Sequence, residues 1–116
     1  MFETSESKFS DEKFDAKRVM LELIEALTPV EAAIRRHDRD LADQLHRAAS
    51  STLLNLGEGS RSDKGNRHKH FALANGSAGE VKSALQLARA WRWVTGAEPQ
   101  FALLDRVLAM LWKLTH

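Results

Sequence analysis

Residues 45–85 read LHRAASSTLLNLGEGSRSDKGNRHKHFALANGSAGEVKSAL, and this stretch decides the fold. It opens with a helical pattern, breaks at Gly-Glu-Gly-Ser (residues 57–60), continues through a basic segment and resumes as a helix with small residues at its middle. The order predicts a helical hairpin with a cationic tip. Its two helices are expected to pack closely around small residues, namely Ala48, Ala49, Gly76 and Gly79. This arrangement favours a binding module over a catalyst.

Helical periodicity extends outward from this hairpin along the whole chain, and no stretch alternates over a strand length. A flexible leader is expected at residues 1–10, followed by a first helix that begins near Asp11 and reaches about Arg36. Pro29 either kinks this helix or starts a new one as its first residue. A kink or short break is favoured because the apolar face continues beyond it. Asp38 is the expected N-cap of the second helix.

Glycine and proline set the remaining boundaries. The second helix is expected to end at residues 57–59, and the third to run from about Ser62 until Gly96 stops it. The fourth starts at Glu98, just before a proline. Four helices with short connections predict an all-α, antiparallel, up-down-up-down four-helix bundle over residues 11–116. The third and fourth helices are apolar on more than one face, so self-association is also expected.

Composition bounds the class of protein. The 116 residues have the length and apolar content of one folded domain. The chain has no Cys, a polar N-terminus unlike a signal peptide, and no apolar run of the ~20 residues that a membrane span needs. A cytoplasmic protein without a membrane partner is expected. The net charge of +1 hides an acidic start and a strongly basic segment at residues 61–70.

This basic segment supplies the candidate nucleic-acid-binding residues, which are Arg61, Lys64, Arg67, His68 and Lys69. Three of them share one helix face, and they lie near a helix N-terminus whose N–H groups also favour anions. Such a patch suits phosphate contacts, which give affinity without reading sequence. A solvated helix start is the alternative interpretation.

Five polar residues interrupt the apolar stripes, and we interpret them as a structural polar network that fixes helix register: Arg47, Asn55, Glu58, Ser77 and Glu80. An acid–base pair is the less favoured alternative. The three tryptophans are expected to be anchors of the oligomer interface, because Trp91 and Trp93 lie on different helix faces and Trp112 is on the fourth helix.

Neither a metal nor another cofactor is expected. His68 and His70 are two residues apart, so on a helix they point in nearly opposite directions. The acid-x-x-His spacing of Asp43 and His46 occurs once, whereas a di-metal bundle needs two such motifs and further carboxylates. No phosphate loop or nucleophile–base constellation is present either, so an enzyme is not expected.

The hairpin also resembles a known family, the 23S rRNA-intervening sequence proteins. The matching motifs are Arg47-Ala48-Ala49, Asn55, Glu58-Gly59, the basic turn, Phe71 and Gly76-Ser77-Ala78-Gly79-Glu80. The accessory variability protein of diversity-generating retroelements is similar in fold. The resemblance implies a ring-like homo-oligomer, most simply a homopentamer. By analogy with the retroelement protein it implies RNA or DNA and a reverse transcriptase as partners.

Two functions follow as expectations. The first is a non-enzymatic homo-oligomer that binds the backbone of RNA or DNA through a basic rim, like retroelement accessory proteins. The second is a protein–protein adaptor or assembly scaffold with no nucleic-acid role. The salt dependence of nucleic-acid binding distinguishes them, because only backbone binding releases counterions.

Overall fold

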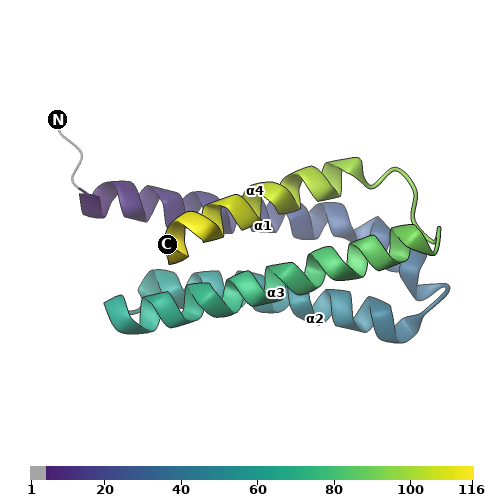
Figure 1. The fold of residues 1–116 in the computed structure, drawn as a ribbon, viewed down its shortest axis with the longest axis horizontal. Coiled ribbons are helices and arrows are strands. Elements are labelled where there is room, and N and C mark those ends of the chain that lie inside the picture. The colour runs from purple at the N-terminus through teal and green to yellow at the C-terminus, as the bar shows by residue number, and fades with distance from the viewer. Residues whose placement is uncertain (1–4) are drawn as a thin grey trace.

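A computed structural model describes residues 5–116, with side chains described from Asp15 onward. This part of the chain forms four α-helices and no strand: α1 (Ser5–Arg35), α2 (Arg39–Arg61), α3 (Lys64–Ala90) and α4 (Glu98–Thr115). The helices lie along a body of 51 × 26 × 20 Å (Figure 1). Helix α1 packs against α2 and α4, and α3 packs against the same two helices. The predicted all-α four-helix bundle is therefore confirmed.

The core is built from the apolar stripes that the helical period predicts. Its largest fully buried side chains come from all four helices and include Met20, Leu23, Ile34, Leu45, Leu56, Phe71, Leu85, Leu104 and Leu111. Asp38 caps α2 as expected, since its carboxylate accepts a hydrogen bond from the Leu41 N–H at 3.0 Å. Among the described helices, none has the combination of length and apolar composition found in membrane spans.

Helix α1 starts earlier than predicted and continues through Pro29. It begins at Ser5 rather than near Asp11, because residues 5–10 contain no Gly or Pro and a helix, once nucleated, propagates through such a stretch. Residues 1–4 of the predicted leader lie outside the described part. Pro29 removes one backbone hydrogen bond from the turn before it. In that turn the Gln100 side chain of α4 donates to the Ala26 carbonyl at 2.8 Å.

The glycines at residues 57–59 do not end α2, which continues to Arg61. Gly59 is buried, and a Cβ added there would lie 2.6 Å from the Cε1 atom of Phe71. A Cβ on Gly57 would meet nothing within 4 Å. The prediction of a helix stop was wrong because Gly59 serves a close contact with the Phe71 ring and adopts no terminating conformation.

The expected close packing around Gly76 and Gly79 is also wrong. A Cβ on either glycine would have no neighbour within 4 Å, although Ala48 and Ala49 of α2 are buried as predicted. Helices α2 and α3 nevertheless form the most extensive helix pair. Among their glycines only Gly59 is in close contact with the facing helix, and Gly76 and Gly79 instead lie beside an open groove between the helices.

Helix α3 ends at Ala90, six residues before the predicted stop at Gly96. Its end is a Schellman motif, in which the Arg92 N–H donates to the Arg89 carbonyl at 2.9 Å and the Trp93 N–H to the Ala88 carbonyl at 3.0 Å. Arg92 takes the left-handed position of this motif with a φ of 63°. The expectation failed because glycine usually fills that position, whereas here an arginine does.

Candidate nucleic-acid interface

The basic tip is the turn that joins α2 to α3, with Arg61, Lys64, Arg67, His68 and Lys69. Only two residues separate the helices, because Arg61 ends α2 and Lys64 starts α3. Asp63 caps α3, and its carboxylate accepts a hydrogen bond from the Asn66 N–H at 3.1 Å. This carboxylate already satisfies part of the helix N-terminus, so an anion at the tip would depend on side-chain charges more than on backbone N–H groups.

The tip presents most of its predicted cations to solvent. Arg61, Lys64, His68 and Lys69 are exposed, whereas Arg67 is half-buried. The Arg61 guanidinium donates to the Glu58 carboxylate at 2.7 Å, and an exposed pair of this kind exchanges readily for another anion. Phe71 is fully buried, so it offers no ring for a base to stack on. The tip therefore offers exposed cations without an exposed phenylalanine ring beside them.

Two of the five residues predicted as a polar network meet between α2 and α3. The Ser77 hydroxyl lies 2.8 Å from the Ser51 hydroxyl, and the Asn55 side chain donates to Ser51. The Asn55 amide oxygen also lies 3.1 Å from the His70 Nδ1. The contacts of Ser77 and His70 are half-buried and link the two helices. Exposed residues outside the network are Arg47, Glu58 and Glu80.

Sequence reasoning missed Ser51 and His70. Ser51 lies one turn before Asn55 on the same face, so its spacing was a usable signal. His70 comes 15 residues after Asn55 and reaches it only because the chain reverses at the tip. Its partner could not be identified without the turn geometry.

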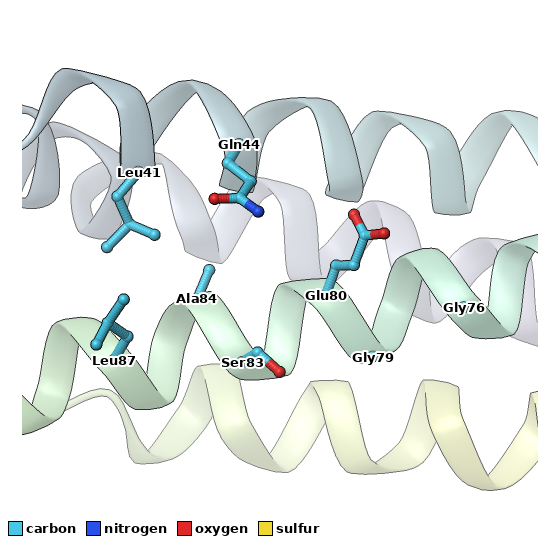
Figure 2. Close-up of a pocket in the computed structure, with 8 residues that line it drawn as sticks. All are labelled: Leu41, Gln44, Gly76, Gly79, Glu80, Ser83, Ala84 and Leu87. Atoms are coloured by element: carbon cyan, nitrogen blue, oxygen red, sulfur yellow. The ribbon is translucent and has the colours of Figure 1, made fainter.

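A groove of about 320 Å³ runs between α2 and α3. Figure 2 shows Gln44 of α2 and Glu80 of α3 extending into the space between the two helices, with Gly76, Gly79 and Ser83 along the α3 side. Glu80 is the one titratable side chain in this lining. The groove therefore lacks the converging acid, base and nucleophile that a hydrolytic site requires.

Two carboxylates near the α1–α2 turn, Glu31 and Asp43, are engaged in ion pairs. Arg35 donates to Asp43 at 2.9 Å and to Glu31 at 3.0 Å, and these hydrogen bonds, first that of Asp43, raise the pKa of Arg35. The His46 imidazole lies 3.4 Å from the Glu31 carboxylate. Asp43 and His46 thus bind different partners. Within the described residues, no group of three or more His, Cys, Asp or Glu side chains is arranged to hold a metal.

The tryptophans differ in burial. Trp91 is 63% exposed and Trp112 is 60% exposed, whereas Trp93 is half-buried against the core. The Trp93 ring stacks on Trp91 and on His37, and the Trp112 ring stacks on His116. Trp93 therefore contributes to the packing of the bundle itself, and Trp91 and Trp112 are the more exposed indoles.

Comparison with known proteins identifies the family. The family model described as 23S rRNA-intervening sequence protein matches residues 12–113. This span includes α2 and α3 in full, most of α1 and α4, and every motif on which the resemblance rests. No curated protein and no solved structure matches the chain. The chain belongs to the 23S rRNA-intervening sequence protein family.

Proposed function

We propose that this protein is a non-enzymatic, self-associating helical bundle that binds the backbone of RNA or DNA through its basic tip. The observation that carries the proposal is the set of exposed cations at the tip, Arg61, Lys64 and Lys69, joined by His68 when it is protonated. The nearby carboxylates are already engaged, Glu58 with Arg61 and Asp63 as a helix cap. The tip can therefore present net positive charge to phosphates.

We infer that successive helices run antiparallel, in up-down-up-down order. The connections cover residues 36–38, 62–63 and 91–97, and such short segments join adjacent ends of neighbouring helices. Figure 1 is consistent with this order, because the α2–α3 turn lies at one end and the other two connections at the opposite end. The basic tip would then lie at the end of the bundle where α1 begins and α4 ends, opposite the other two connections.

Exposed apolar side chains support self-association. Leu54 of α2 is 67% exposed, and Leu73 and Leu87 of α3 are 49% and 46% exposed. A second copy would remove this apolar surface from water. A ring, a pentamer if the family resemblance extends to assembly, would repeat the tip along one rim. Repetition raises the affinity for a long polyanion without any new type of contact.

The same surface favours an alternative, an adaptor that binds a protein partner and no nucleic acid. A reverse transcriptase, the partner implied by the likeness to retroelement accessory proteins, fits either function. A cytoplasmic location also belongs to the proposal, because RNA and DNA are available there. Retention of mixed-sequence RNA and duplex DNA at about 50 mM salt tests the choice. Both should be retained with similar affinity, and retention of neither would favour the adaptor.

Self-association yields a separate prediction. Light scattering at micromolar concentration should give a mass that is a multiple of 13.0 kDa. Changing Leu54 and Leu73 to Glu should lower that mass, because it would bury carboxylates in the interface. Leu21→Glu is the matched control, since Leu21 is 44% exposed on α1. An intact protein that runs as a 13.0 kDa monomer would refute self-association.

A further inference from the structure

An aromatic stack lies where the α1–α2 and α3–α4 connections meet, at the end of the bundle away from the tip (Figure 1). The His37 and Trp93 rings are 5.4 Å apart between centroids and 2° from parallel. The Trp91 ring continues the stack at 5.8 Å and 15° from Trp93. With 63% of its surface exposed, Trp91 ends the stack with ring surface open to solvent.

The charge around this stack is positive. The two connections and the helix ends beside them, residues 35–40 and 89–98, contain five arginines against three carboxylates, Asp38, Asp40 and Glu98, and Asp38 is engaged as the α2 cap. The ion pairs at this end join Arg35 to Glu31 and to Asp43, and include neither Arg36 nor Arg92. An open aromatic ring in a connection that also carries arginines suits a base and its adjacent phosphates.

Arg92 is held beside Trp91 in a strained conformation. Its φ of 63° lies in the left-handed region, which glycine adopts at lower cost than any residue with a Cβ. The Schellman hydrogen bonds require this conformation but no side chain. The motif therefore gives no reason for an arginine at this position, whereas an arginine directly after Trp91 in the chain puts a cation in the same connection as the open ring.

We propose that Trp91 stacks a base of single-stranded RNA or DNA, and that Arg92 and Arg36 contact the adjacent phosphates. The inference deepens the proposed function, because it gives the bundle a second contact that senses single strands. The basic tip contacts phosphates of any nucleic acid, while the stack requires an unpaired base. Charge favours this occupant over a second copy of the chain, which is tested as the competing outcome.

The test measures the affinity of the intact protein, Trp91→Ala and Trp91→Phe for a single strand of about 12 nucleotides and for a duplex of the same sequence. Trp91→Ala should weaken single-strand binding about 5- to 100-fold, because replacing a base-stacking aromatic residue with alanine typically costs that much affinity. Trp91→Phe should keep much of the affinity, and duplex binding should not change. Trp112→Ala is the control for removing an exposed indole, since Trp112 is 60% exposed. It should leave both affinities unchanged when they are measured at a concentration at which light scattering shows the native assembly mass for both variants.

A fluorescent base adds a direct readout. An aminopurine in the single strand should be quenched by the intact protein and by Trp112→Ala, and should stay bright with Trp91→Ala. Arg92→Gly should raise the melting temperature, by relieving the strain, while it weakens single-strand binding. Arg92→Lys should keep the binding.

The outcomes separate this proposal from the proposed function. Unchanged single-strand binding by Trp91→Ala would overturn the stacking site alone, and so would a fall in the mass of the assembly, which would make Trp91 a contact between copies. If removal of the tip charges leaves duplex binding intact while Trp91→Ala still weakens single-strand binding, the tip fails and the stacking site stands. An intact protein that binds neither form would overturn both.

Discussion

Replacing Arg61, Lys64 and Lys69 with Gln should remove most of the affinity for mixed-sequence duplex DNA. The slope of log affinity against log salt should become less steep by about 2.7 for each tip that contacts the DNA. Each of the three removed cations would neutralise one phosphate, and each neutralised phosphate contributes about 0.9 to the slope. The fold should be unaffected, because all three side chains are exposed. Arg67 stays unchanged in this variant, since it is half-buried and its loss would confuse binding with folding.

The matched control removes the same charge elsewhere. Lys17, Arg47 and Arg106 are exposed on α1, α2 and α4, and changing them to Gln lowers the net charge equally. Fluorescence anisotropy should show near-native affinity and an unchanged salt slope for this control. Equal losses in both variants would mean that net charge, and not the tip, governs binding.

The second large effect concerns Gly59. Gly59→Ala should lower the free energy of unfolding by about 1–3 kcal/mol, because the new methyl group overpacks the buried Phe71 ring. This loss should appear despite a helix-propensity gain of up to about 1 kcal/mol. Urea unfolding at fixed protein concentration measures it, since assembly makes apparent stability depend on concentration.

Gly57 supplies the control, because a Cβ there meets open space in the same helix. Gly57→Ala should raise the free energy of unfolding by about 0.5–1 kcal/mol through helix propensity alone. In a Phe71→Leu background the cost of Gly59→Ala should shrink, giving a coupling energy of about 0.5–3 kcal/mol in a double-mutant cycle. Equal effects of the two alanine variants would contradict the contact.

The helices were predictable because their signals are local. Apolar spacing, the Asp38 cap and the proline after Glu98 each specify helix through neighbouring residues. Helix ends were less predictable. Gly59 looks like a stop signal in the sequence, and only the position of Phe71, 12 residues later, shows that it serves packing. Arg92 carries no sequence signal for a left-handed conformation.

In the candidate sites, too, features set by neighbouring residues were predictable and contacts between distant residues were not. Exposure of Arg61, Lys64, His68 and Lys69 follows from their place at or near a turn between two helices, whereas the half-burial of Arg67 depends on how the helices pack. The contact of Asn55 with His70 depends on how α2 and α3 align, which the sequence does not specify. The stack of His37 on Trp93 joins residues 56 positions apart in two different connections, so no periodicity could indicate it.

The central claim is that the basic tip binds nucleic-acid backbone, and the salt dependence of binding tests it most directly. The affinity of the intact protein for mixed-sequence duplex DNA should be measured from about 50 to 200 mM salt. We predict that log affinity falls linearly with log salt. The slope should be about −2.7 or steeper if all three tip cations of one subunit contact phosphates. A slope near zero, or no binding at the lowest salt, would contradict the claim.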